Sequence, residues 1–204
     1  MLETPKRDRR AEQREATRVE ILAAAWDLVR AHGLAGLSLR DLADAVGMRA
    51  PSLYSYFPSK HAIYDAMFAQ GAREYVEQEA AVPTTGDPVA DIAASMEFFM
   101  AFSRANPARH QLLFQRTIPG FVPSEDAYAV AVEGLEAARR RLHAVGITDQ
   151  AALDLVTAIG SGLTSQQLAN DPDGDRWSRL VRDAAAMFYA HMVRTHPATR
   201  KDQS

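Results

Sequence analysis

Cysteine is absent from the 204-residue sequence. Its absence excludes disulfide bonds, thiolate catalysis and zinc sites built on cysteine ligands. No apolar run approaches the length of about 18 residues that a membrane-spanning helix needs. The first residues are charged and lack the apolar segment of a secretory signal. We therefore expect a cytoplasmic protein that has no membrane partner.

Signatures of catalysis and metal binding are missing as well. The six histidines form no His-Glu-x-x-His pair. The segment 158–164, Ala-Ile-Gly-Ser-Gly-Leu-Thr, has neither Gly-x-Gly-x-x-Gly nor Gly-x-Ser-x-Gly spacing and lies within a helical pattern. We predict no catalytic residue, no metal site and no cofactor, and hence a protein that is not an enzyme.

Basic residues are fewer than acidic ones, 23 against 26, which gives a net charge of −3. For a nucleic-acid partner, the distribution of charge matters more than its sum. Residues 1–60 hold ten Lys and Arg against eight Asp and Glu, so the remainder holds 13 against 18. Arg10, Arg14 and Arg18 are spaced by four and share one helix face if the first helix extends that far back. They either contact phosphate or form a solvated charged face.

Apolar residues recur at helical spacing along most of the chain, and no alternating run indicates a strand. We predict an all-α protein of about nine helices. The first helix is expected to begin at Thr17, where the apolar periodicity starts. The clearest linker is the segment 83–88, Pro-Thr-Thr-Gly-Asp-Pro.

The segment 38–60 is the most informative part of the sequence. Leu39 and Leu42 bury one face of a short helix, and Gly47 suits a tight turn with positive φ. Pro51 falls in the first turn of a second helix, where a missing N–H costs nothing. This pattern is typical of a helix-turn-helix whose second helix enters the DNA major groove.

Two strings within residues 18–75 resemble the DNA-binding domain of the TetR/AcrR family of transcriptional regulators. They are Leu53-Tyr-Ser-Tyr-Phe-Pro-Ser-Lys60 and Gly33-Leu-Ala-Gly-Leu-Ser-Leu-Arg-Asp-Leu-Ala43. The resemblance is specific over the first third of the chain and weak afterwards. It implies a dimeric repressor that a small-molecule effector releases from a palindromic double-stranded DNA operator. The alternative is a helical ligand-binding or scaffold protein with a degenerate helix-turn-helix, against which the charges of Arg40 and Lys60 argue.

The resemblance implies roles for the side chains of this segment. Ser38 caps the second helix, meets a phosphate, or does both. Tyr56 and Lys60 match positions that hold the phosphate backbone in the family, and Tyr54 either reaches DNA or is half-buried. The candidates for contacts with base edges are Arg40, Arg49, Ala50, Pro51, Ser52, Tyr54 and Ser55, of which the two arginines suit guanine.

The remainder of the chain is expected to bind the effector and to form the dimer. Candidate ligand-binding residues are Met96, Phe99, Met100, Phe102, Phe114, Phe121 and Tyr128, although such a row is also usual in a core. Arg104, Arg109 and Arg116 either attract an anionic effector or are solvated. Candidate dimer contacts are Val156, Ile159, Leu163, Gln167, Leu180, Ala184, Phe188 and His191, unless they complete the core of one protomer.

These predictions divide the chain into four parts. A flexible arm covers residues 1–16, and the helix-turn-helix DNA-binding domain covers residues 17–62. A helix from residue 59 links this domain to a helical effector-binding and dimerisation domain over residues 63–195. Residues 196–204 are expected to form a C-terminal tail.

Overall fold

The computed structural model describes residues 9–195, which form nine α-helices and one 3-10 helix and contain no strand. The all-α prediction is therefore confirmed. The helices are α1 (Arg9–His32), α2 (Leu39–Ala45), α3 (Ala50–Leu53), α4 (Lys60–Glu79), α5 (Pro88–Ala105), α6 (Pro107–Phe114), α7 (Glu125–Ala144), α8 (Gln150–Asn170), η1 (Ser178–Leu180) and α9 (Val181–Thr195). None of those described is long and apolar enough to cross a membrane.

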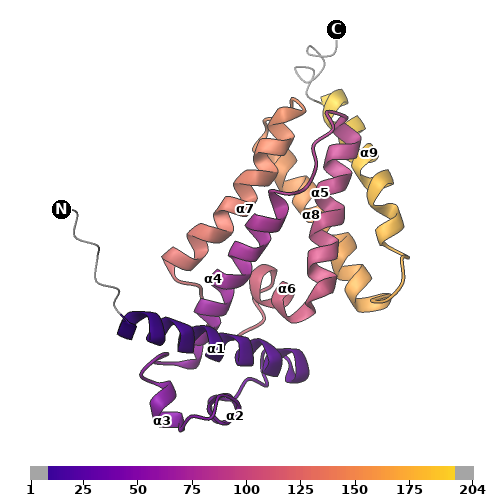
Figure 1. Ribbon diagram of the computed structural model, residues 1–204. Coiled ribbons are helices and arrows are strands. Elements are labelled where there is room, and N and C mark those ends of the chain that lie inside the picture. Colours follow the sequence, from indigo (N-terminus) through magenta and orange to yellow (C-terminus); the bar gives the residue numbers. More distant parts are fainter. Residues whose placement is uncertain (1–8, 196–204) are drawn as a thin grey trace, which may run out of the picture.

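The helices form two connected groups (Figure 1). Helices α1, α2 and α3 form a compact unit at one end, and α4 leads from it into the rest of the molecule. There α4 packs against α7, and α5 packs against α8 and α9. One apolar core unites α1–α4 with parts of α6 and α7, and a second unites α5, α8 and α9 with the end of α7.

Side-chain caps set the start of most helices. An oxygen of a Ser, Asp or Asn side chain accepts a hydrogen bond from the first turn of α2 and of each helix from α4 to α8. Such caps satisfy backbone donors that have no partner within the helix. The capping residues are Ser38, Ser59, Asp87, Asn106, Ser124 and Asp149.

The first helix differs from its prediction. It begins at Arg9 rather than at Thr17, because the Arg, Ala, Glu and Gln residues before Thr17 favour a helix although they carry no apolar periodicity. The first eight residues of the predicted arm and the predicted tail over 196–204 lie outside the described residues. The division of the chain into domains stays a prediction.

Candidate nucleic-acid interface and ligand cavity

Helices α2 and α3 form a helix-turn-helix. Gly47 makes the turn at φ +65°, which a residue with a Cβ adopts only under strain. The amide of Met48 then donates to the carbonyl of Ala43 at 2.8 Å. Leu53 and Phe57 are buried beneath α3. The opposite face of α3 is therefore turned to solvent.

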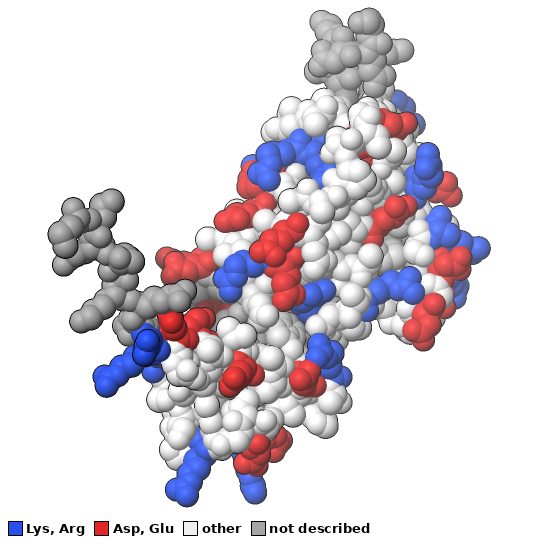
Figure 2. All heavy atoms as spheres, viewed as in Figure 1, with Lys and Arg blue, Asp and Glu red and all other residues white. Residues whose placement is uncertain are grey.

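The predicted base-reading residues lie on α2, on α3 and on the residues that flank α3. Arg40, Arg49, Pro51, Ser52, Tyr54 and Ser55 are exposed, whereas Ala50 is half-buried against the core. Tyr54 is 51% exposed, so about half of the side chain is accessible, and its role toward DNA stays a prediction. Figure 2 shows basic side chains extending from the end of the molecule that α2 and α3 form.

Two arginines of α1 hold the C-terminal end of α3. Arg14 donates to the carbonyl of Ser55 and lies 5.1 Å from the ring centroid of Tyr56. Arg18 donates to the carbonyl of Tyr56 at 2.7 Å and lies 4.3 Å from the ring centroid of Phe57. The two roles considered from the sequence, a phosphate contact and a solvated charged face, do not include these contacts within the protein. Their partners are about 40 residues away in the chain, so the spacing of the arginines alone did not reveal them.

The three predicted phosphate-binding side chains also have contacts within the protein. The hydroxyl of Ser38 accepts from the amide of Asp41 at 3.4 Å and so caps α2. The Nζ of Lys60 donates to the carbonyl of Ala35 at 3.4 Å. Tyr56 is half-buried beside Arg14. Their roles toward phosphate stay predictions.

A junction ties the loop before α7 to the start of α4. The Asp65 carboxylate accepts from the amide of Ser124 at 2.6 Å and from its hydroxyl at 2.8 Å. The Phe121 ring centroid lies 5.7 Å from that of Tyr64, whose hydroxyl donates to the carbonyl of Leu34. Burial raises the pKa of Tyr64. Phe121, predicted to bind ligand, therefore belongs to this junction.

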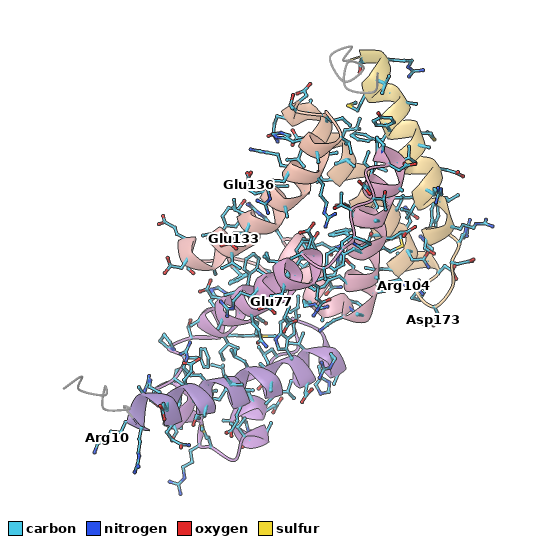
Figure 3. The ribbon with its side chains drawn as sticks, turned by 45° about the horizontal axis from the view of Figure 1, so that its top comes forward. Arg10, Glu77, Arg104, Glu133, Glu136 and Asp173 are labelled. Carbon is cyan, nitrogen blue, oxygen red and sulfur yellow. The ribbon has the colours of Figure 1, made fainter. Side chains whose placement is uncertain are left out.

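A cavity of about 380 Å³ lies between α4, α5, α7 and α8, and the end of α6 closes part of it. Its volume falls within the range of about 300–1,000 Å³ that is usual for small-molecule sites. Of the seven predicted ligand-binding residues, four line it: Met96, Phe99, Phe114 and Tyr128. The acidic residues labelled on α4 and α7 in Figure 3, Glu77, Glu133 and Glu136, do not belong to the lining that the described residues form.

The other predicted ligand-binding residues lie elsewhere. Met100 is buried in the second core against α9. Phe102 is buried beneath the guanidinium of Arg109, which lies 3.6 Å from its ring centroid. Arg109 in turn donates to the Glu74 carboxylate at 2.6 Å. None of the three arginines considered for an anionic effector, Arg104, Arg109 and Arg116, lines the cavity that the described residues enclose.

Arg141, which the sequence did not single out, is held by the segment that follows α4. Its Nε donates to the Glu79 carboxylate at 2.6 Å, and its Nη2 donates to the carbonyls of Glu79 at 3.1 Å and Val82 at 2.8 Å. Its Nη1 donates to the hydroxyl of Thr84 at 3.1 Å. Four of its five N–H donors therefore have partners.

Asp91 is the second charged group of the cavity wall. Its carboxylate accepts from the amide and hydroxyl of Thr85 at 2.7 and 2.8 Å and from the amide of Gly86 at 3.0 Å. Burial raises the pKa of Asp91, but these hydrogen bonds and the charge of Arg141 outweigh it, so that the pKa is lowered overall. The nearby Tyr75 stays a neutral phenol, because burial and the Glu79 charge raise its pKa strongly.

His110 lies behind the aromatic wall in a neutral form. Its Nδ1 is 2.9 Å from the hydroxyl of Ser103, which itself donates to the carbonyl of Phe99 at 2.7 Å. Nδ1 must therefore carry the proton, and Nε2 accepts from the Gln115 amide at 3.2 Å. Burial lowers the pKa of His110.

The predicted dimer contacts fall into two groups. Gln167 and Phe188 are buried within the protomer, so their prediction as dimer contacts is wrong for this conformation. The Oε1 of Gln167 accepts from the amides of Trp177 at 2.9 Å and Ser178 at 3.0 Å, which fixes the turn before α9. The others are half-buried or exposed: Val156, Ile159, Leu163, Leu180, Ala184 and His191.

A sequence model described as "Bacterial regulatory proteins, tetR family" matches residues 21–67, the segment that holds the helix-turn-helix. The HTH-type transcriptional regulator Rv1816 of Mycobacterium tuberculosis is 26% identical over 132 residues. That match covers 63% of this chain and 56% of the relative, so the chain spans little more than half of the relative's length.

Solved structures share the fold over most of the chain. The regulatory protein SCO4313 is similar at a TM-score of 0.71 and 22% identity, over 90% of this chain and 98% of that one. The transcriptional regulator FadR of Bacillus subtilis, solved with stearoyl-CoA, is similar at a TM-score of 0.65 and 12% identity, over 83% and 96% of the two chains. At these identities the likeness establishes the fold. The sequence matches make the segment that holds the helix-turn-helix similar to the tetR family of bacterial regulatory proteins, and the solved structures extend the likeness of fold over most of the chain.

Proposed function

We propose that the protein is a homodimeric DNA-binding transcriptional regulator, a repressor that a small-molecule effector releases from a palindromic operator. The observation that carries this proposal is the exposed face of α2 and α3, which presents two arginines and small hydroxyl-bearing side chains. The match of residues 21–67 to the tetR family model and the name of the mycobacterial relative support the regulatory role.

In this proposal the exposed face divides into reading and positioning groups. Arg40 and Arg49 each donate two hydrogen bonds to the O6 and N7 of a guanine. Lys60, Tyr56 and Ser38 contact phosphates and set the register of the protein on DNA.

Two copies are needed, because a helix as short as α3 contacts only a few base pairs. A dimer places two copies of α3 in successive major grooves, about 34–36 Å apart. Large apolar side chains exposed on α8, η1 and α9 support a surface for a second copy: Leu155 is 39% exposed, Leu180 36% and Met187 74%. The candidate contacts of that surface are Val156, Ile159, Leu163, Leu180, Ala184 and His191.

Release by an effector follows from the position of α4. This helix begins at the DNA-binding unit and forms one wall of the cavity. The contact of Asp65 with Ser124 ties its start to α7, another wall. A ligand that favours a different spacing of these walls moves α4. This movement increases the distance between the two copies of α3 in the dimer. The ligand must bind the DNA-free form better, and the difference in affinity sets the extent of release.

Selection of bound fragments from a random duplex pool tests the proposal. We expect a palindromic motif with half-sites about one helical turn apart. The protein is first refolded from denaturant to remove any ligand carried through purification. No enrichment at low salt with this protein would contradict the proposal and favour a degenerate helix-turn-helix.

Three variants then test the assigned contacts. Arg40→Ala should weaken operator binding by about 1–3 kcal/mol and relax the preference at one base pair. Lys60→Ala should weaken binding to all sequences alike. Arg140→Ala, which removes an exposed arginine from α7, serves as the matched control and should change neither. Equal losses on operator and random DNA for Arg40→Ala would show that Arg40 reads no base.

A further inference from the structure

The cavity between α4, α5, α7 and α8 has a chemistry that restricts what it can bind. Resting on the proposed function, we infer that its ligand is an uncharged, largely apolar molecule that carries a ring system, and that the cavity disfavours anions. Three features of the wall carry this inference: its aromatic side, the engagement of its charged groups, and its balance of charge.

Aromatic rings form one side of the cavity. The ring centroids of Phe99 and Phe114 lie 4.9 Å apart, and that of Tyr75 lies 5.6 Å from Phe114. Gly134 allows Tyr75 to lie against α7, since a Cβ at this glycine would come within 3.0 Å of the tyrosine ring. The exposed Tyr128 also belongs to the lining. Rings at these separations favour a ligand that is itself a flat ring, through offset or edge-to-face contacts.

The charged groups of the wall are already engaged. Arg141 uses four of its five donors on Glu79, Val82 and Thr84. Asp91 accepts three hydrogen bonds from residues 85 and 86. Arg141 has one N–H left for a ligand, and to offer an anion more than this one donor it would have to leave a paired carboxylate that is itself only 10% exposed. Such a loss leaves a buried charge without a partner, which is strongly unfavourable.

The charges around the cavity also disfavour an anionic ligand. The positive charge of Arg141 faces two negative ones, those of Glu79 and Asp91. Arg141 and Asp91, the two charged groups of the wall, cancel, and Glu79 adds a negative charge beside Arg141, so that an anionic ligand would meet no net positive charge in this region of low dielectric. The hydroxyl of Tyr75, which has no hydrogen-bond partner among residues 9–195, offers one uncharged polar contact.

Two fluorescent probes of the same three rings test the inference in the absence of DNA. N-phenylnaphthylamine is uncharged, and anilinonaphthalene sulfonate adds one sulfonate. We expect saturable binding of the uncharged probe at one site per chain and binding of the sulfonate weaker by about 10-fold or more. Equal or tighter binding of the sulfonate would overturn the inference.

Blocking variants locate the probe. Ala138→Phe places a ring in the cavity from α7, and Val156→Phe does so from α8. We expect each to weaken binding of the uncharged probe by about 10-fold or more. Ala144→Phe, at the exposed end of α7, is the matched control and should change it less than about 2-fold. Circular dichroism confirms that each variant is folded, and two walls are blocked separately in case one variant does not fold.

Unchanged binding in a folded blocking variant would refute the site. Because the probes are titrated without DNA, this failure is distinguishable from failure of the proposed function. A protein that selects a palindrome but prefers the sulfonate overturns only the ligand class. A protein that binds the uncharged probe but selects no DNA overturns only the regulator.

Discussion

Arg141 and Arg139 lie two residues apart on α7, each paired with a glutamate, and differ in burial. In the pair of Arg141 with Glu79 the side chains are 16% and 10% exposed. In the pair of Arg139 with Glu136, at 3.3 Å, they are 36% and 42% exposed. Replacing each arginine with methionine keeps an unbranched side chain and removes the charge. The two variants therefore compare a buried with an exposed ion pair within one helix.

The expected losses differ several-fold. Arg141→Met leaves the Glu79 carboxylate buried without its partner and frees two backbone carbonyls, which should cost about 3–5 kcal/mol. Arg139→Met removes an exposed pair and should cost about 0–1 kcal/mol. For a chain of this size each kcal/mol lowers Tm by about 2–4 °C. The expected decrease in Tm is therefore about 6–20 °C for Arg141→Met and at most about 4 °C for Arg139→Met.

Urea denaturation followed by circular dichroism measures both free energies of unfolding. Arg141→Met combined with Glu79→Leu should recover much of the loss, because it removes both buried charges together. Equal losses for the two single variants would refute the reasoning. So would a double variant whose loss equals the sum of its single variants.

Three further predictions follow from other contacts. Arg18→Ala should weaken operator binding without changing the slope of log affinity against log salt, because the Arg18 guanidinium is engaged by the carbonyl of Tyr56 within the protein. Lys60→Ala should reduce that slope by about 0.9; equal changes in slope would contradict this. The lowered pKa of His110 means that the unfolded chain takes up its proton first, so stability should fall as the pH drops below 6.5. His110→Gln should remove that part of the pH dependence, measured by urea denaturation at several pH values. Gln167→Leu should destabilise the fold by about 1–3 kcal/mol, because it leaves two part-buried amides without acceptors; a shift in Tm below about 2 °C would argue against it.

The parts of the structure that the sequence predicted depend on local chemistry. The helix-turn-helix could be identified because Gly47 and Pro51 have conformational preferences that act at their own positions. The start of the helix after Ser59 followed in the same way from the capping preference of that residue. Periodicity likewise predicted the other long helices.

The parts that it missed depend on contacts between distant segments. Arg14 meets Ser55 across 41 residues, and Arg141 meets Glu79 across 62. No spacing along the chain distinguishes these arginines from solvated ones. The same applies to Phe121, whose aromatic side chain suits a cavity and a junction equally well. Only the packing of α4 against α7 decides between them.

Helix α3 is too short to be stable on its own, since the hydrogen bonds of four residues do not offset the unfavourable free energy of helix nucleation. Its shape depends on the burial of Leu53 and Phe57 and on the grip of Arg14 and Arg18. The exposed side chains of α3 therefore contribute little to its stability, and these positions do not require residues that favour a helix. Descendants of one ancestral protein can exchange these side chains and acquire new target sequences without a new fold. A library randomised at positions 49, 52, 54 and 55 should consequently yield mostly folded proteins.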